Sequence, residues 1–289
     1  MTWFRVVLGL LLAAGGAAAQ RVKPDAGVFS GCRGGTGAYH QMFTKEGGVA
    51  GAPRYTYIAA EVELAGGDAD SIAITEPDKD VAFVFLGGNG TDGWWLDAGL
   101  QYSPLRRDWA LFFWDEGEAA RKAAGTPFAR RSTPTLGPDD RFAPDQTVSL
   151  ELFVPQRPVL GARRPLDNRV AVIARGRGRA GGSAGGKLQV RRYVFEVPGG
   201  WPRDGSADGR GLNLRYTVSL AQVGEMDVTT LSRFGGTRVK NVYVGSSYRT
   251  RRPLRPSDVQ RVCSYPNEKV VKVRGGRVTI SYDPKTWAE

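Results

Sequence analysis

The sequence predicts an all-β protein, an antiparallel β-sandwich that forms one domain with little helix. Short runs of alternating apolar and polar residues follow one another along the chain, and Gly, Pro, Asp and Asn separate them. No stretch keeps the apolar spacing of a long amphipathic helix. Hydrophobic residues make up 41% of the chain, which is enough for a sizeable core. These three observations favour sheets that pack against each other.

The amino-terminal segment, residues 1–19, has the composition of a cleavable secretory signal peptide. Arg5 supplies positive charge, Val6 to Ala14 form an apolar stretch, and the small residues Ala17 to Ala19 precede the expected cleavage site. The apolar stretch is far shorter than the roughly 20 residues that cross a bilayer, and no later stretch approaches that length. We therefore expect residues 20–289 to form one domain that is secreted or periplasmic and does not span the membrane.

The expected strands are the alternating runs themselves. In chain order they are Tyr55–Leu64, Val81–Leu86, Trp94–Ser103, Trp109–Trp114, Val148–Val154, Val170–Ala174, Leu188–Val197, Leu212–Leu220, Val239–Val244, Val270–Val273 and Arg277–Tyr282. Two short helical segments are also expected, over Glu116–Ala124 and over Ser257–Val262, the second a single turn with Ser257 as its cap. The last two strands form a hairpin, because the glycines in Arg274-Gly275-Gly276 permit the positive φ angles of a tight turn.

The two cysteines, Cys32 and Cys263, lie near opposite ends of the mature chain. Exported proteins meet oxidising conditions, so we expect a disulfide between them, and closing so long a loop contributes on the order of 4–5 kcal/mol in the loop-entropy treatment. The alternative is two unpaired buried thiols. A second alternative for Cys32 is lipid attachment, since Phe29-Ser30-Gly31-Cys32 loosely resembles a lipoprotein box, although it lies far beyond the apolar run.

The net charge of +11 comes mainly from arginine. In an exported protein such charge favours acidic surfaces, anionic polysaccharide or extracellular nucleic acid, and a solvated surface is the default interpretation. Arginine outnumbers lysine, and Gly and Ala are abundant, which indicates a GC-rich bacterial genome. The segment Arg175-Gly176-Arg177-Gly178-Arg179 resembles Arg/Gly segments that bind RNA in intracellular proteins. Here we expect a mobile loop near residues 175–187 and no specific nucleic-acid binding.

Histidine limits the possible chemistry, because His40 is the single histidine of the chain. A zinc site built on several histidines is excluded. A Ser-His-Asp arrangement would have to centre on His40, which lies beside no nucleophile motif such as G-x-S-x-G, and we expect a surface or edge histidine. No Gly-rich phosphate loop stands between a strand and a helix. We therefore expect neither a cofactor nor a metal ion.

Alternation along two strands places polar and aromatic side chains together. In Tyr55–Leu64 one face carries Tyr55, Tyr57, Glu61 and Glu63, and in Trp94–Ser103 one face carries Trp95, Asp97 and Gln101. If the two sheets curve, both faces line one groove, where aromatic rings stack on sugar rings or on extended peptide.

The carboxylates in this groove are the candidate catalytic residues. Glycoside hydrolysis uses two carboxylates about 5–10 Å apart, and Asp97 with Glu61 or Glu63 is the candidate pair. The alternative is that these are ordinary solvent-facing strand residues, because Glu61-Val62-Glu63 is a pattern that many antiparallel strands show by chance. We favour the second interpretation for catalysis.

The most distinctive block is Trp94-Trp95-Leu96-Asp97-Ala98-Gly99-Leu100-Gln101-Tyr102-Ser103, followed by Trp109-Ala110-Leu111-Phe112-Phe113-Trp114. It resembles a hairpin of the concanavalin A-like jelly-roll sandwiches and, more distantly over residues 83–114, the glutamic peptidases. The resemblance implies a jelly-roll fold. It does not carry over the peptidase activity, because Asp97 stands where that family has its catalytic glutamine and the partner glutamate has no counterpart. The jelly-roll glucanase pattern E-x-D-x-E is also absent. The aromatic residues that suit a core are Trp94, Trp109, Phe112, Phe113 and Trp114. Trp95 suits a binding surface, because it alternates with Asp97 and Gln101.

The sequence as a whole predicts noncatalytic binding at the cell surface or in the envelope. Carbohydrate is the expected ligand, held by Tyr55, Tyr57, Trp95, Asp97 and Gln101. One alternative is a hydrolase of glycosidic or peptide bonds that uses the groove carboxylates. Another is a structural envelope protein whose basic loops contact anionic polymers. The sequence does not predict the oligomeric state.

Overall fold

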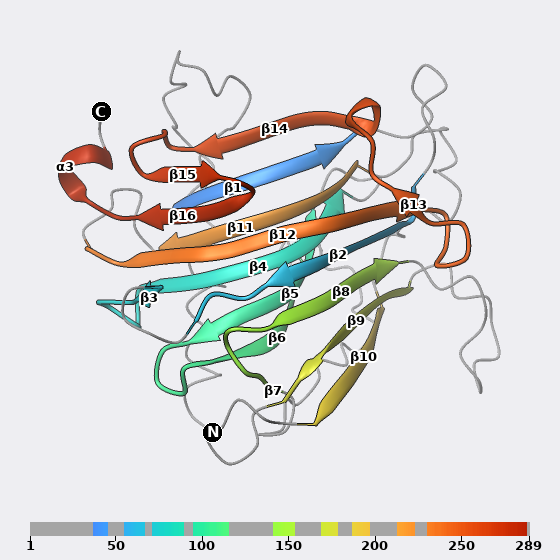
Figure 1. Ribbon diagram of the computed structural model, residues 1–289, viewed down its shortest axis with the longest axis horizontal. Helices are drawn as coiled ribbons and strands as arrows, with labels where there is room; N and C mark the ends of the chain where they lie inside the picture. Colours follow the sequence, from blue (N-terminus) through green and yellow to red (C-terminus); the bar gives the residue numbers. More distant parts are fainter. Residues whose placement is uncertain are drawn as a thin grey trace, which may run out of the picture.

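Strand is the dominant local structure of this chain, and the strands gather in two sheets packed face to face (Figure 1). This antiparallel sandwich confirms the predicted fold class. Among the described residues, helix is limited to the 3-10 turn η1 (Pro256–Asp258) and the four-residue α3 (Pro284–Trp287). The computed structural model describes residues 37–45, 55–66, 71–89, 95–115, 141–153, 169–178, 187–196, 213–222 and 230–287. The predicted signal segment, Cys32 and the predicted helix Glu116–Ala124 lie outside these residues.

The seven-stranded sheet A has the order β14-β1-β11-β4-β5-β6-β7. Chain segments far apart in sequence meet in it, because β1 pairs with β11 on one side and with β14 on the other. Its strands are β1 (Gly37–Thr44), β4 (Asp80–Asn89), β5 (Trp95–Ser103), β6 (Asp108–Asp115), β7 (Arg141–Phe142), β11 (Asn213–Gln222) and β14 (Val259–Tyr265).

The nine-stranded sheet B has the order β10-β9-β8-β2-β12-β16-β15, and β3 and β13 both pair with β12. All of its described pairings are antiparallel. Its strands are β2 (Tyr57–Glu63), β3 (Ile72–Ala73), β8 (Thr147–Phe153), β9 (Arg169–Arg177), β10 (Leu188–Glu196), β12 (Arg233–Gly245), β13 (Arg252–Pro253), β15 (Val271–Arg274) and β16 (Arg277–Ser281).

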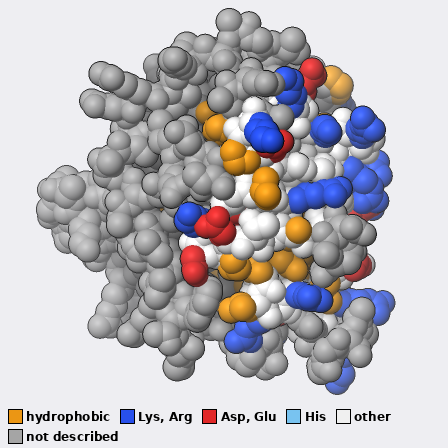
Figure 2. Space-filling model, turned by 90° about the vertical axis from the view of Figure 1, so that its left-hand side faces the viewer, with side chains coloured by type: hydrophobic (Ala, Val, Ile, Leu, Met, Phe, Trp, Pro, Cys, Tyr) orange, Lys and Arg blue, Asp and Glu red, His pale blue; other side chains and the backbone are white. Residues whose placement is uncertain are grey.

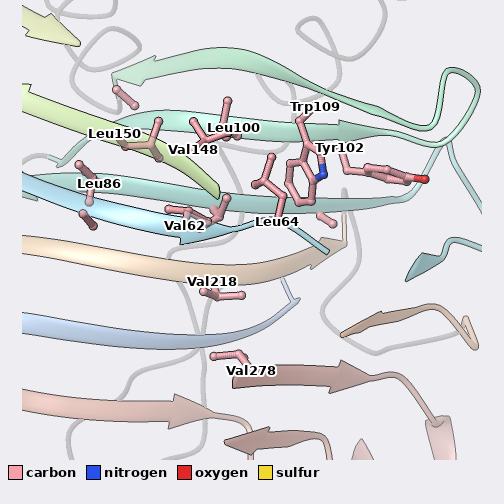
Figure 3. Packing of buried hydrophobic residues seen from close by; sticks show 14 of the residues in the cluster. Val62, Leu64, Leu86, Leu100, Tyr102, Trp109, Val148, Leu150, Val218 and Val278 are labelled. Atoms are coloured by element: carbon pink, nitrogen blue, oxygen red, sulfur yellow. The ribbon is translucent and has the colours of Figure 1, made fainter. Parts of the chain in front are cut away.

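The core lies between the facing sides of the two sheets, where the inward residues of the central strands are mostly apolar. Val62 and Leu150 of sheet B meet Leu86 and Leu100 of sheet A in this layer (Figure 3). Burying each such side chain stabilises the fold by about 1.5–3 kcal/mol. Trp109 is completely buried there, and its ring lies 5.8 Å from that of Phe234 on β12. Aromatic contacts of this kind hold sheet A to sheet B.

Two predictions about irregular segments are wrong. A helical turn over Ser257–Val262 is expected, but the turn ends at Asp258 and β14 begins at Val259. Its N-cap residue is Arg255 and not Ser257. The start of the mobile loop expected near residues 175–187 is also wrong, because Arg175 to Arg177 continue strand β9 and pair with β10. Residues 179–186 of that expected loop lie outside the described residues.

The carboxy-terminal hairpin is confirmed. Strands β15 and β16 pair from Val271 opposite Ile280 to Arg274 opposite Arg277. The two residues that link the strands, Gly275 and Gly276, have φ angles of 56° and 77°. Positive φ at both central positions is the geometry that matches the twist of a two-residue hairpin.

Cys263, one member of the predicted disulfide, is 2% exposed on β14 and is not a free thiol. Because Cys32 lies outside the described residues, the bond between the two stays a prediction. No helix in the described part of the chain is long and apolar enough to cross a membrane.

Candidate functional site

The predicted ligand-binding residues divide between the two sheets. Tyr57, Glu61 and Glu63 lie on β2 of sheet B, whereas Asp97 and Gln101 lie on β5 of sheet A. The residues that alternate with them belong to the shared core, so the two groups point out of the sandwich on opposite surfaces. The single groove that the sequence predicts is therefore wrong. The candidate catalytic pairing of Asp97 with Glu61 or Glu63 is wrong for the same reason.

The outer surface of sheet A is buried around Asp97. Its carboxylate is 4% exposed and lies 2.7 Å from the guanidinium of Arg215. Phe83 and Phe85, on the neighbouring strand β4, are each 9% exposed and pack edge-on against Phe112. Asp97 is thus enclosed by its charge partner Arg215 on the outer surface of sheet A.

The other two predicted ligand-binding residues of β5 are Gln101 and Trp95. Gln101 is half-buried and lies in register between Phe83 and Ala110. Trp95 begins the strand opposite Asn89, and its side chain lies outside the described residues.

Tyr55 precedes β2 and does not share the outward face of Tyr57. Its ring belongs to the core, and its hydroxyl donates to Asp258 Oδ1 at 2.9 Å. Arg252 donates to both carboxylate oxygens of Asp258 and to the Tyr55 hydroxyl. These bonds with Arg252 hold the pKa of Asp258 well below its usual range, while burial and the bond to Asp258 raise the pKa of Tyr55 to about 12. Tyr55 therefore anchors the segment before β14.

The outer surface of sheet B is rich in cations, and we call it the basic face. The strand registers place outward basic side chains on β9, β10, β12, β15 and β16, where acidic ones are few. Figure 2 likewise shows Lys and Arg spread more widely than Asp and Glu over the described surface in its view. The members described are Arg175, Arg177, Arg192, Arg233, Arg238, Lys240, Lys272, Arg274 and Arg277, together with the carboxylates Glu61, Glu63 and Glu151.

The two glutamates of β2 are held by neighbours on this face. Glu63 lies 2.7 Å from Lys240 Nζ and 2.9 Å from Arg277 Nη2. The bond to Lys240 lowers the pKa of Glu63 below its ordinary value. Glu61 accepts a hydrogen bond of 2.7 Å from the Asn241 side-chain amide. A general acid needs a raised pKa, so Glu63 is suited to balancing charge and not to donating a proton.

Tyr57 is enclosed although it points outward. It is 1% exposed, and its hydroxyl donates to Glu151 Oε2 at 2.9 Å. Glu151 also forms an ion pair with Arg175 of β9. The ring of Tyr57 lies 6.0 Å from Phe153 and 6.4 Å, edge-on, from Tyr248. Tyr57 thus supports the surface and is itself covered.

The segment between β12 and β13 adds an arginine to the basic face. Arg251 lies with its guanidinium carbon 3.6 Å from the ring centroid of Tyr248 and 5.8 Å from that of Tyr243. Its Nη1 donates to the Tyr248 carbonyl oxygen at 2.7 Å. Tyr248 itself is 56% exposed. A cation over an aromatic face is stabilised by the ring quadrupole, which fixes the guanidinium in place.

Sequence reasoning missed Arg251, Tyr248 and Glu151 as members of this surface. The stretch Ser246-Ser247-Tyr248-Arg249-Thr250-Arg251-Arg252 offers the one available signal, a tyrosine among closely spaced arginines. No sequence signal marks Glu151, because its partners Tyr57 and Arg175 are distant from it in sequence.

The single histidine is buried and not a surface residue, which corrects the expectation for it. His40 is 8% exposed on β1, and its Nδ1 lies 2.9 Å from Ser264 Oγ. Burial lowers the pKa of His40 to about 4. Among the described residues, no three His, Cys, Asp or Glu side chains gather in a way that would hold a metal ion.

Comparisons with known proteins find structural matches of low similarity. No protein family model matches the chain, and no curated protein matches it. Among solved structures, the alginate lyase vAL-1 from Chlorella virus is similar at a TM-score of 0.21 and 13% sequence identity, with 75% of this chain and 96% of that chain covered. A likeness at this level carries no functional inference for this chain.

Proposed function

We propose that this protein is a noncatalytic binder of acidic polysaccharide at the cell surface or in the envelope, and that the basic face of sheet B is its binding surface. The predicted export signal supports the location. The excess of cationic over acidic side chains on one sheet face supports the charge of the ligand. Neighbouring strands lie about 4.7–4.9 Å apart, so a flat face offers its charges in rows that a repeating polyanion can contact at several points.

One observation carries this proposal most directly. Arg192, Lys272 and Arg274 are exposed on the basic face and have no ion-pair partner among the described side chains. Cations that are not neutralised from within the protein are available to an anionic polymer. Glu61 and Glu63, in contrast, are engaged by Asn241, Lys240 and Arg277, which supports binding without catalysis.

A pair of matched polymers tests the proposal. Polygalacturonate carries one carboxylate per sugar, and its fully methyl-esterified form has the same backbone without the charge. We expect the protein to bind polygalacturonate, to bind it more weakly as ionic strength rises, and to bind the ester at least about tenfold more weakly, since exposed charges are screened by salt. The same samples are assayed for new reducing ends and for unsaturated products. Equal affinity for both polymers would contradict acidic-polymer binding, and chain cleavage would contradict a noncatalytic role.

A further inference from the structure

Two arginines flank the buried hydroxyl of Tyr57 on the basic face. Burial raises the pKa of Tyr57 to about 12, and Arg251 and Arg175 both act to lower it, so both guanidinium groups lie within electrostatic reach of that hydroxyl. Arg175 comes from β9 and Arg251 from the segment after β12. The ring of Tyr248 adjoins both Tyr57 and Arg251.

The two arginines differ in how they are neutralised. Arg175 is paired with Glu151, which is 4% exposed and also accepts the Tyr57 hydroxyl bond. Arg251 has no acidic partner among the described residues, and its one hydrogen bond runs from Nη1 to the Tyr248 carbonyl. Within the described part of the chain the Nε and Nη2 edge of Arg251 therefore has no acceptor, while the stacked ring of Tyr248 fixes the plane of the guanidinium.

A fixed guanidinium edge with two parallel donors matches a carboxylate. Carboxylate oxygens accept two parallel N–H bonds from arginine, and a lysine ammonium offers the same charge without that geometry. A guanidinium already held by a ring loses less conformational entropy when the ligand arrives.

We propose that Arg251, held by Tyr248, forms a subsite for the carboxylate of a uronic acid residue. This inference rests on the proposed function and sharpens it, because it names one sugar class and one recognising side chain. Arg175, which is paired with Glu151, borders the subsite.

Arg249 provides a matched control for the test. It lies on the same segment, is exposed, and has no ion-pair partner among the described side chains. The substitutions Arg251→Lys and Arg249→Lys both retain the positive charge. Affinities are measured by calorimetry for short oligogalacturonates. Dextran sulfate, which the basic face should bind through charge density, reports whether each variant still presents a folded surface.

We expect Arg251→Lys to weaken oligogalacturonate binding about tenfold and Arg249→Lys to change it less than about twofold, because only the first removes a bidentate contact. Dextran sulfate affinity should stay within about twofold for both variants. Equal oligogalacturonate affinities of the two variants would overturn the subsite and leave the proposed function standing. Wild-type protein that binds neither polymer would overturn the proposed function itself, and the subsite with it.

Discussion

Arg215 donates to both carboxylate oxygens of Asp97, with Nη2 2.7 Å from Oδ1 and 2.8 Å from Oδ2. Arg215 lies on β11 and Asp97 on β5, and Gly87 of β4 stands in register between them. Burial raises the pKa of Asp97, and the guanidinium of Arg215 opposes that change. The pair ties three strands of sheet A together on its outer surface, which makes Asp97 a structural residue.

Loss of the Asp97 carboxylate should destabilise the fold and leave ligand binding unchanged. Asp97→Ala removes the carboxylate that pairs with the buried Arg215, and breaking a buried ion pair in this way costs about 3–5 kcal/mol. The free energy of unfolding in urea measures this. The double variant Asp97→Leu, Arg215→Met should recover most of the loss. Folded Asp97→Ala that is as stable as wild type but no longer binds polygalacturonate would contradict the structural role.

A side chain at position 87 should disturb the same pair. A Cβ added to Gly87 would overlap the Asp97 carboxylate and the Leu96 carbonyl oxygen. We expect Gly87→Ala to lower the free energy of unfolding by about 1–3 kcal/mol, as overpacked sites do. In an Asp97→Ala background part of the overlap is removed, so the added cost of Gly87→Ala should be smaller. Strict additivity of the two substitutions would show that the overlap with Asp97 is unimportant.

Acidification should destabilise the protein through His40. Its pKa is lowered from 6.5 to about 4 by burial, so below pH 6.5 the unfolded chain binds a proton that the folded chain does not. The contribution of neutral His40 to the free energy of unfolding is fully present above pH 6.5. It falls as the pH drops toward 4, and the loss amounts to about 2–3 kcal/mol at pH 4.5.

The variant His40→Gln isolates this effect when both proteins are unfolded in urea at pH 7 and pH 4.5. Burial raises the pKa of Asp80, so this residue makes stability increase as the pH falls. Because Asp80 is present in both proteins, its effect cancels in the comparison. An equal loss of stability in wild type and variant would refute the assignment to His40.

Removal of a carboxylate from the basic face should strengthen polyanion binding. Glu63→Gln releases Lys240 and Arg277 from their ion pairs and removes a negative charge from the surface. We expect polygalacturonate affinity to rise about two- to threefold at low salt. Asp78→Asn, at an exposed turn position before β4, removes the same charge elsewhere and should change affinity little. Weaker polygalacturonate binding by Glu63→Gln than by wild type would contradict this role of Glu63.

Strand alternation predicts which side chains point inward better than it predicts which sheet they join. Ile58, Ala60 and Val62, which alternate with the polar residues of β2, belong to the core, because the period of two depends on local backbone geometry alone. The partition of β2 and β5 between the two sheets depends on strand pairings that are distant in sequence, such as β2 with β12 and β4 with β11, and no local pattern records them. Alternation also fails beyond the ends of a strand. Tyr55 precedes β2, so its side chain does not follow the period of two that holds within the strand.

The sequence predicts only some members of the basic face, which carries the proposed function. Tyr57, Glu61 and Glu63 were assigned correctly to one outward face. Burial of Tyr57 beneath Tyr248 and the capture of Glu151 by Arg175 arise from tertiary contacts. The net charge shows that cations are in excess, but only the strand order shows that they gather on one face of sheet B.

The most direct test of the central claim, that the basic face of sheet B binds acidic polysaccharide, compares two charge reversals. Arg192→Glu acts on exposed β10 within the face, and Arg106→Glu acts on the exposed turn between β5 and β6 of sheet A, with the same change in net charge. The account predicts that Arg192→Glu weakens polygalacturonate binding about tenfold and Arg106→Glu less than about twofold at low salt. Equal losses from the two variants, or a greater loss from Arg106→Glu, would contradict it.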